Sequence, residues 1–425
     1  MIRVFKFGGA LLKDVRGIRQ MASIVHEFKC EPLVVVVSAV GKTTNALENL
    51  LSLARKNQTT ALQQAYFALK GEHVRLIRSL ELKDERTLLH QIEEDFYSLW
   101  QMLEKLPKNS FSAYDSVVSF GELFSGKIAA FWLKEKQFPV KLTDARQLIA
   151  TDENFTQANV NWAYTRKIID ARLVSELHRG NIVLTQGFIA AGHKGHITTL
   201  GREGSDFSAA VLAYALQADE VCIWKDVPGL MNCDPRVFSD AVKLPHVSYN
   251  EAIELAFYGA SVIHPKTLQP LQKIGVPLKV CAFYAPETSP TLIDAGEEND
   301  ADIPKIILKE HQTLLSISSR DLSFMAEENL KTVFSAFSRH KIHINLMQNS
   351  AVSFSVCFDE NPEKCEAVIE SLKDEFVLKY NEGLQLLTVR HDDGKMLQKF
   401  THHKQIFLSQ KNRTTQQVLM RPVKE

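Results

Sequence analysis

The sequence predicts an α/β protein built on an open, mostly parallel sheet with helices on both faces, followed by a smaller α+β region. Two observations in the first 300 residues predict the sheet. Short apolar runs rich in β-branched residues alternate with stretches of helical periodicity, and each run ends in glycine or polar residues. A weak internal repeat after residue 300 predicts the α+β region. Because 425 residues are too many for one hydrophobic core, we expect two or three domains.

The first forty residues predict a βαβ unit. The segment IRVFKFGG (2–9) is a short apolar run that ends in two glycines, and residues 14–30 carry apolar side chains at helical spacing. PLVVVVSAVGKTTN (32–45) is a β-branched run that breaks into a polar turn. Residues 46–108, which are rich in Leu, Gln, Glu and Lys, then predict a helical excursion from the sheet.

Further strands of the sheet are predicted at 138–144, 181–190, 220–227 and 276–284. Ligands of open α/β sheets bind beyond the carboxyl ends of the strands, so we expect functional residues there. The polar stretch PETSPTLIDAGEENDADIP (286–304) predicts a domain boundary, which gives one domain at 1–300 and a second region at 301–425.

The second region contains the internal repeat. TLLSISSRDL (313–322) resembles LQLLTVRHDD (384–393), and FSRHKIHINLMQNSAVSFSV (337–356) resembles FTHHKQIFLSQKNRTTQQVL (400–419). Each copy has the pattern strand, helix, strand, strand. We therefore expect two tandem α+β modules at about 305–380 and 381–425, with the second one abbreviated.

Composition and charge exclude several functional classes. Fifty Lys and Arg balance fifty Asp and Glu, so no nucleic acid partner is indicated. The N-terminus does not have the pattern of a signal peptide, and the longest apolar run, Leu33–Val37, is too short to cross a bilayer. We therefore expect a cytoplasmic protein with no membrane partner.

The cysteines indicate neither disulfides nor a metal site. None of the six belongs to a CxxC pair, and several lie in apolar runs. We expect reduced core residues at Cys30, Cys222, Cys233, Cys281, Cys357 and Cys365.

Two turns with glycine follow the first two predicted strands. In Lys6-Phe7-Gly8-Gly9 the glycines would let the backbone approach a phosphate, and the lysine would supply a point charge. A plain β-turn is an equal alternative, because GxxxxGK[ST] is absent. In SAVGKTTN (38–45), hydroxyls and amides at a helix start would suit an anion, although Thr43 or Thr44 could simply cap the helix.

Two further segments combine charge with glycine. SFGE (119–122) is expected to open a helix, where Glu122 could bind a substrate ammonium or complement the helix dipole as a first-turn acid. TTLGREGSD (198–206) is the most informative run, because Arg202 can grip a carboxylate bidentately. A glycine turn capped by Ser205 or Asp206 would explain the glycines of this run but not the arginine.

The remaining motifs are KDVPG (225–229), DPR (234–236) and GASVIHPKT (259–267). A strand-end aspartate, a turn and a basic residue can hold a nucleotide, although such turns are also common without function. We expect His264 to be a packed turn histidine rather than a catalytic base.

Taken in order, these segments resemble the aspartate kinases of the amino-acid kinase family, and the repeat resembles tandem ACT modules. The resemblance implies an amino-acid-kinase-like sheet, transfer of phosphate from ATP to the side-chain carboxylate of L-aspartate with Mg²⁺, and feedback by an amino acid. This reaction begins the biosynthesis of lysine, threonine and methionine from aspartate. We expect the monofunctional form, because no residues remain for a fused homoserine dehydrogenase.

The resemblance also implies residue roles. Lys6 and Asp206 would act in catalysis, with Lys6 on the γ-phosphoryl group. Aspartate would be bound by Ser38, Thr43, Glu122, Arg202 and Ser205. The nucleotide would be bound by Lys6, Phe7, Gly8, Gly9, Lys225, Asp226, Met231, Arg236, Ser261 and Lys266. An effector in the ACT region would contact Met325, Asn345, Asn349 and Ser350.

The chain departs from the family pattern at several positions. Ala10 replaces a threonine, Ser261 replaces a lysine, and Glu203 puts a negative charge beside the anion site, so we expect Glu203 to point away from the phosphates. Asn345 and Ala351 stand where acidic residues are common in lysine-inhibited members. A buried ammonium without a carboxylate partner is costly, so an uncharged effector such as threonine, or no effector at all, is an alternative to lysine.

Two alternatives to an active aspartate kinase follow. One is an amino-acid kinase for glutamate or N-acetylglutamate, and the other is a non-catalytic amino-acid sensor on the same fold. Paired ACT modules typically join edge to edge between subunits, so we expect a homodimer through this region.

Overall fold

The computed structural model describes residues 1–105, 110–260, 263–297, 300–321, 323–392 and 394–422. The chain forms two compact units. The first unit consists of Met1–Leu230, Lys243–Ala256 and Ser261–Glu298, and the second of Met231–Val242, Phe257–Ala260 and Asn299–Glu425. The second unit thus includes two short segments that the sequence analysis assigns to the first domain.

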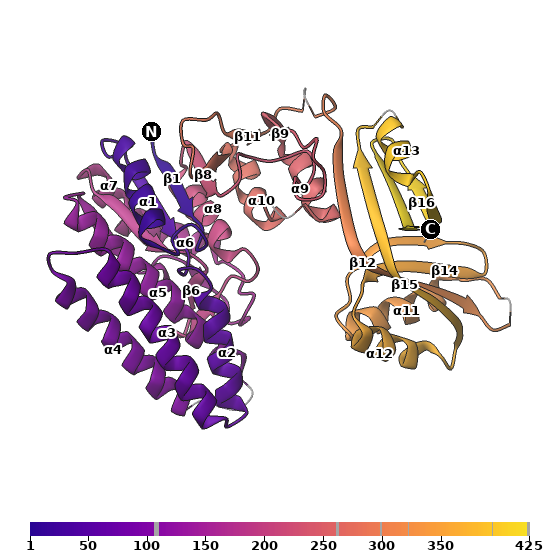
Figure 1. Ribbon diagram of the computed structural model, residues 1–425, viewed down its shortest axis with the longest axis horizontal. Coiled ribbons are helices and arrows are strands. Elements are labelled where there is room, and N and C mark those ends of the chain that lie inside the picture. The colour runs from indigo at the N-terminus through magenta and orange to yellow at the C-terminus, as the bar shows by residue number, and fades with distance from the viewer. Residues whose placement is uncertain (106–109, 261–262, 298–299, 322, 393, 423–425) are drawn as a thin grey trace. The chain divides into compact units, whose positions relative to one another are not determined.

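The described residues of the first unit contain an eight-stranded sheet with the order β3-β5-β2-β1-β8-β10-β11-β9 (Figure 1). Neighbouring strands are parallel except for β10 and β11. The strands are β1 (Arg3–Phe7), β2 (Leu33–Val37), β3 (Val140–Thr143), β5 (Ile182–Gln186), β8 (Glu220–Lys225), β9 (His246–Ser248), β10 (Leu278–Ala282) and β11 (Thr291–Asp294). The predicted open, mostly parallel sheet is confirmed.

Helices cover both faces of this sheet, which explains why every residue of β2 is buried. Helices α1 (Val15–Glu27) and α5 (Phe111–Glu135) cover one face. Helix α8 (Gly204–Leu216) covers the other, with α6 (Trp162–Arg172) and α10 (Pro265–Ile274) packed against it. The shorter helices are η1 (Ala145–Gln147), α7 (Val174–His178) and α9 (Tyr249–Tyr258).

The helical excursion is confirmed. It consists of α2 (Thr43–Arg55), α3 (Thr59–Ser79) and α4 (Glu85–Glu104), which pack with α5 (Figure 1). Their apolar faces extend the core of the sheet, for example where Phe96 of α4 stacks on Phe124 of α5 with ring centroids 4.4 Å apart.

A small second sheet lies beside the first and carries two loops that matter for the site. Its strands are β4 (Ala150–Thr151), β6 (Ile189–Gly192) and β7 (Ile197–Thr199), in the order β4-β6-β7. The sequence analysis predicts one strand at 181–190, but the structure breaks it at Gly187 into β5 and β6. A side chain at Gly187 would collide with Ser205, since its Cβ would lie 2.5 Å from Ser205 Cβ.

The second unit is a six-stranded sheet with the order β13-β14-β12-β15-β17-β16 within its described residues. Its strands are β12 (Lys305–Ser319), β13 (Ile344–Asn349), β14 (Ser353–Asp359), β15 (Phe376–Arg390), β16 (Lys404–Lys411) and β17 (Thr415–Pro422). Its helices are α11 (Glu327–Arg339), α12 (Pro362–Leu372) and α13 (Lys395–Thr401).

The two modules of this unit are nested, whereas the sequence analysis places them in tandem. The first half of β12, Lys305–Lys309, pairs with 386–390 beside β17, and its second half, Gln312–Ser319, lies between β14 and the first half of β15. Both long strands therefore serve both modules, because the register shifts between Lys309 and Leu314. The predicted division at residue 380 falls inside β15.

Two smaller predictions, for the stretch 286–304 and for Cys30, differ from the structure. The stretch 286–304 contains strand β11, which the polar composition conceals. Five cysteines are buried and free as expected, whereas Cys30 is exposed.

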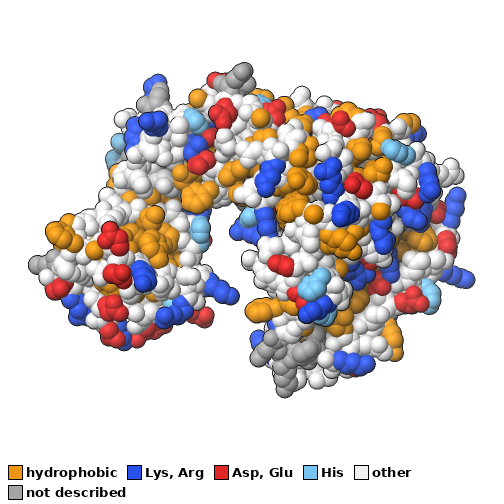
Figure 2. Space-filling view, turned by 180° about the vertical axis from the view of Figure 1, so that it is seen from behind, with side chains coloured by type: hydrophobic (Ala, Val, Ile, Leu, Met, Phe, Trp, Pro, Cys, Tyr) orange, Lys and Arg blue, Asp and Glu red, His pale blue; other side chains and the backbone are white. Residues whose placement is uncertain are grey.

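None of the described helices is long and apolar enough to span a membrane. Acidic side chains lie among the Lys and Arg side chains on the face shown in Figure 2.

Candidate active site

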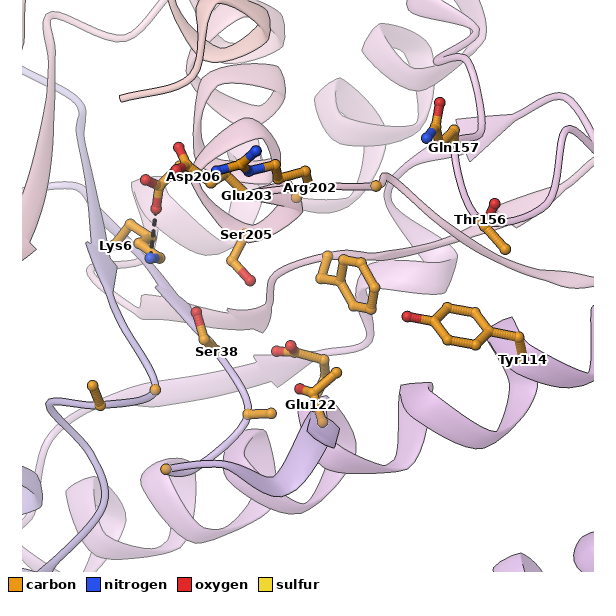
Figure 3. Close-up of a pocket in the computed structure, with 18 of the residues that line it drawn as sticks. Lys6, Ser38, Tyr114, Glu122, Thr156, Gln157, Arg202, Glu203, Ser205 and Asp206 are labelled. Atoms are coloured by element: carbon orange, nitrogen blue, oxygen red, sulfur yellow. Dashed lines mark ion pairs between the residues drawn. The ribbon is translucent and has the colours of Figure 1, made fainter. Parts of the chain in front are cut away.

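A cavity of about 580 Å³ lies at the carboxyl ends of β1, β2, β5 and β8 in the first unit (Figure 3). This is the edge at which an open α/β sheet places its ligands. The lining residues are Lys6, Gly9, Ala10, Ser38, Ala39, Gly41, Thr44, Tyr114, Glu122, Thr156, Gln157, Phe188, Gly201, Arg202, Glu203, Gly204, Ser205, Asp206 and Lys225. Residues of KFGG, SAVGKTTN, SFGE, TTLGREGSD and KDVPG thus line one cavity, whereas no described residue of DPR or GASVIHPKT lines it.

One end of the cavity holds two lysines around a buried aspartate. Asp206 Oδ1 lies 2.5 Å from Lys6 Nζ, and Asp206 Oδ2 lies 3.1 Å from Lys225 Nζ. Burial alone would raise the pKa of Asp206, but the two ammonium groups outweigh burial and lower it. Two lysines and one carboxylate leave a net charge of about +1 here, which suits a phosphate.

Close approach of two turns explains Gly9 at this end. A Cβ on Gly9 would lie 1.9 Å from the carbonyl oxygen of Ala39, and the amide of Gly41 donates to the carbonyl of Gly9 at 2.8 Å. A Cβ on Gly8 would lie 3.6 Å from Lys6 Nζ, which is an ordinary contact, so packing does not require glycine at position 8. Both turns can therefore present backbone to a phosphate.

Glu122 faces the cavity from the middle of α5, not from a helix start. The alternative of a first-turn acid is therefore wrong, because α5 begins at Phe111. Burial raises the pKa of Glu122 to about 8, although the amide of Ala39 and the charge of Lys6 act in the opposite direction. Its Oε2 is buried and has no hydrogen-bond partner among the described residues. An ammonium group would satisfy this oxygen.

The TTLGREGSD run forms the turn between β7 and α8. Gly201 and Glu203 have φ angles of 80° and 52°, a left-handed conformation that glycine adopts easily and glutamate does not. Arg202 has no ion-pair partner within the described part of the chain, and it lies across the cavity from Glu122 in Figure 3. The cavity thus holds a free guanidinium and an unsatisfied carboxyl group.

Comparison with known proteins identifies this arrangement. Residues 1–282 match the model of the amino acid kinase family. The chain is 33% identical over 367 residues to lysine-sensitive aspartokinase 3 of Escherichia coli, with 84% of this chain and 78% of the relative covered. It is 30% identical over 407 residues to aspartokinase 1 of Arabidopsis thaliana, with coverage of 91% and 70%. The chain belongs to the aspartokinase family.

The structure agrees with this assignment. It superposes on E. coli aspartokinase III in complex with lysine and aspartate with a TM-score of 0.83 and 29% identity, covering 98% of this chain and 95% of that one. The match to the same enzyme in complex with aspartate and ADP has a TM-score of 0.82 at 28% identity. Both comparisons include the second unit, so the aspartokinase architecture extends over the whole described chain.

Several predicted residues of this aspartokinase line the cavity, and others do not. Lys6, Gly9, Ser38, Glu122, Arg202, Ser205, Asp206 and Lys225 line it. Thr43 instead turns its hydroxyl to the carbonyl of Val40 at 2.6 Å and to His73 Nε2 at 3.4 Å. The next residue, Thr44, lines the cavity, because one step along a helix rotates the side chain by about 100°.

Three residues predicted to bind the nucleotide do not line this cavity. The side chain of Phe7 is buried in the core, where it stacks on Trp224 with centroids 6.0 Å apart. Lys266 lines a different pocket and donates to the carbonyl of Leu200 at 3.4 Å. Asp226 is exposed and does not line the cavity.

The remaining nucleotide predictions concern other parts of the chain. Arg236 belongs to the second unit, where it pairs with Asp234 at 2.7 Å. Met231 also belongs to the second unit, and Ser261 lies outside the described residues.

His264 accepts from the amide of Lys266 at 3.1 Å and caps α10, which suits a packed turn histidine. Glu203 is among the lining residues, but its Oε2 is buried, so the expectation that its carboxylate points away from the phosphates stays a prediction.

Sequence reasoning missed four lining residues: Tyr114, Thr156, Gln157 and Phe188. Phe188 follows the end of β5, so the strand-end rule could have found it. Thr156 and Gln157 lie in a loop without any motif, and Tyr114 lies two helical turns before Glu122. Nothing in the sequence marks these three.

The four predicted effector residues lie in the second unit. Met325 is packed in a hydrophobic core with Ile317 and Val333, which removes its side chain from a ligand surface. Asn349 and Ser350 lie at the exposed turn between β13 and β14. The side chain of Asn345 accepts from Lys309 Nζ at 2.9 Å and donates to Gln312 Oε1 at 2.8 Å. Both ends of the Asn345 amide are therefore already hydrogen-bonded to protein side chains.

Proposed function

We propose that this aspartokinase transfers the γ-phosphoryl group of ATP to the side-chain carboxylate of L-aspartate and forms 4-phospho-L-aspartate. One observation carries the proposal. The cavity pairs a lysine-rich end with a buried, unsatisfied Glu122 and an unpaired Arg202. The neighbouring E. coli structure was solved with aspartate and ADP, and this chain has the chemical groups to bind both.

Aspartate would be held at its amino-acid end, so that its side chain points toward the lysines. Arg202 would bind the α-carboxylate bidentately, and Glu122 would accept hydrogen bonds from the ammonium. The hydroxyls of Ser38 and Ser205 line the space between these groups and Lys6, and would donate to the substrate.

The chemistry requires little beyond positioning and charge. An oxygen of the substrate's side-chain carboxylate forms a bond to the γ-phosphorus, while the bond from that phosphorus to the β,γ-bridging oxygen breaks and ADP leaves. The attacking group is already ionised, so no strong general base is needed. Lys6 and Lys225 lower the energy of the charge on the transferring group, and the backbone at Gly8 and Gly9 holds the phosphates.

Mg²⁺ would enter with ATP. Mg²⁺ usually retains water and binds through substrate phosphates with one or two carboxylates, and Asp206 is the acid closest to the lysines. When bound, the ion would neutralise phosphate charge. The described residues contain no group of three His, Cys, Asp or Glu side chains that could hold a metal.

Trapping the acyl phosphate with hydroxylamine tests this proposal. We expect hydroxamate to form only when ATP, Mg²⁺ and aspartate are all present. Arg202→Ala should raise the KM for aspartate by about 10²-fold, because a charged hydrogen bond is lost. Arg179→Ala, which removes an exposed arginine paired with Glu176, is the matched control. Folded wild-type protein without hydroxamate above background would contradict the proposal and favour a sensor.

Substrate preference distinguishes an aspartate kinase from kinases that act on glutamate or N-acetylglutamate. Glu122 suits a free ammonium, and N-acetylglutamate has none, so we expect this compound to be inactive. Glutamate is one methylene longer and would displace its side-chain carboxylate from the lysines. Turnover of glutamate or N-acetylglutamate faster than aspartate would contradict the assignment.

We further propose that an amino acid, lysine or threonine, regulates the enzyme through the second unit, and that the chain forms a cytoplasmic homodimer through that unit. Strand β13 is an edge of the sheet and exposes Met347 by 50%, which suits edge-to-edge pairing. Sedimentation should give twice the 48.0 kDa chain mass. A monomer at micromolar concentration would contradict the dimer. Assays with lysine and threonine added singly would identify the effector.

A further inference from the structure

Asp115 is a buried carboxylate that the proposed chemistry does not use. It lies on α5 about two helical turns before Glu122 and is 0% exposed. Its two oxygens accept from the amide of Thr156 at 3.1 and 3.0 Å and from the amide of Thr199 at 2.9 Å. Oδ1 also accepts from Thr199 Oγ1 at 2.8 Å.

These bonds join three separate elements of the cavity wall. Asp115 belongs to the helix that presents Tyr114 and Glu122. Thr156 lies in the loop before Gln157, and Thr199 is the last residue of β7, three positions before Arg202. A single side chain thus connects the ammonium-binding helix, the 156–157 loop and the turn that carries the guanidinium.

Further contacts fix the positions of the groups that donate to Asp115. Thr156 adopts a left-handed conformation with φ of 70°, which a non-glycine residue holds only when its surroundings fix it. The amide of Ala158 donates to the carbonyl of Thr199 at 2.9 Å, so the loop and the strand end move together. From the other side, Lys266 Nζ donates to the carbonyl of Leu200 at 3.4 Å.

We propose that Asp115 is a positioning residue that sets the separation between Arg202 and Glu122, and so matches these two groups to the α-carboxylate and the α-ammonium of the substrate. Asp115 does not line the cavity, so it does not contact the substrate directly. It acts by holding the 156–157 loop and the β7–α8 turn against α5. This inference rests on the proposed binding of aspartate between Arg202 and Glu122.

Acceptor atoms are essential to this role. The two backbone amides that face Asp115 can only donate, whereas the hydroxyl of Thr199 can donate or accept. Asp115→Asn could therefore keep these contacts, with its amide oxygen facing both backbone amides and its NH₂ group donating to Thr199 Oγ1. Asp115→Leu has a similar volume but no acceptor, so it would leave both backbone amides unpaired and remove the connection.

The test compares Asp115→Leu and Thr199→Val with wild type. Asp115→Leu should raise the KM for aspartate by about tenfold or more, and should change the KM for ATP by less than about threefold, since the lysines are held by Asp206. The ratio of kcat/KM for aspartate to that for glutamate should stay within about twofold, because both substrates present the same α-carboxylate and α-ammonium. Thr199→Val removes only the hydroxyl bond and should give about a third of the effect.

Asp95→Leu is the matched control. Asp95 is a partly buried acid on α4, and it pairs with Lys127 at 2.6 Å without lining the cavity. A merely structural role for Asp115 would change both KM values together, as the control would if it loosens the fold. Equal changes in both KM values, or an unchanged KM for aspartate in folded Asp115→Leu, would overturn the proposal.

Amide hydrogen exchange gives a readout that is independent of activity. In the ligand-free wild-type protein, the amides of Thr156 and Thr199 should be protected, and Asp115→Leu should increase their exchange by about tenfold or more while β1 and β2 stay protected. Unchanged exchange at both amides would contradict the role of Asp115. If the wild type exchanged as expected but formed no hydroxamate, the proposed function would fail while the connection made by Asp115 would stand.

Discussion

Two buried side chains of similar shape, Glu122 in the first unit and Gln312 in the second, have opposite surroundings. Glu122 is 3% exposed, and its Oε2 has no hydrogen-bond partner among the described residues. Gln312 is 1% exposed, accepts from Asn345 at 2.8 Å and donates to Asp359 at 2.9 Å. A buried polar group without a partner costs free energy, and where such a group faces a cavity, as Glu122 does, a ligand can supply the missing partner. A satisfied group indicates structure.

The comparison predicts that substitutions in the cavity change activity more than stability. The largest effect should come from Lys6→Ala, which removes the ammonium 2.5 Å from Asp206 at the phosphate end. We expect kcat to fall by about 10²–10³-fold, as when one stabilising donor is removed from a transition state. Hydroxamate formation measures this, with the exposed Lys29→Ala as control. A fall of less than tenfold would mean that Lys6 does not face the transferring group.

Glu122→Gln should give the next largest effect. Without the carboxylate, the KM for aspartate should rise by about 10²-fold, because the ammonium loses a charged partner in a buried site. Steady-state kinetics with the exposed Glu27→Gln as control measures the change.

The same substitution should also stabilise the ligand-free protein at alkaline pH. The pKa of Glu122 in the folded state, about 8, lies above its ordinary value of 4.5, so the folded protein retains a proton that the unfolded chain has lost. The free energy of unfolding contributed by this group therefore falls as pH rises from about 4.5 to 8. Urea unfolding at pH 6 and pH 9 should show this loss in the wild type and not in Glu122→Gln. Equal losses in both proteins would show that Glu122 is not the titrating group.

Gln312→Ala should show the opposite pattern. It would remove the hydrogen bonds that Gln312 makes with Asn345 and Asp359, at a cost of about 1–3 kcal/mol to the second unit, whereas kcat without effector should stay within about twofold. The chain allows a selective measurement, because Trp100, Trp132, Trp162 and Trp224 all lie in the first unit. Circular dichroism should register an earlier unfolding transition that tryptophan fluorescence does not. Coincident transitions, or a large fall in kcat, would break the comparison.

The smallest effect concerns Glu203, which has a φ of 52° and lines the cavity. Glu203→Gly should raise the free energy of unfolding by up to about 1 kcal/mol, because glycine adopts this conformation without strain. It should also lower the KM for ATP severalfold by removing a negative charge near the phosphates. Gln217→Gly, at a φ of 49° on the same helix, relieves the same strain without a change in charge. An equal change in KM from both would show that charge is irrelevant.

Sequence patterns predicted the sheet because its strands are buried on both faces and read as apolar runs. The site was predictable where a turn has a residue type with one obvious use, as with Lys6 and Arg202. Prediction failed where the outcome depends on rotation or tertiary contact. Thr43 and Thr44 differ by one helical step, and the role of Asp115 depends on loops that reach it from 41 and 84 residues away. The nested modules escaped detection because β12 and β15 each run through both.

Calorimetry of aspartate binding at pH 7, in buffers of different ionisation enthalpy, tests most directly the claim that Glu122 binds the substrate ammonium. With a pKa of about 8, Glu122 is mostly protonated in the free protein, and binding of the substrate ammonium should release close to one proton. Glu122→Gln should release none. Binding of aspartate to the wild type without proton release, or the same release from Glu122→Gln, would contradict the account.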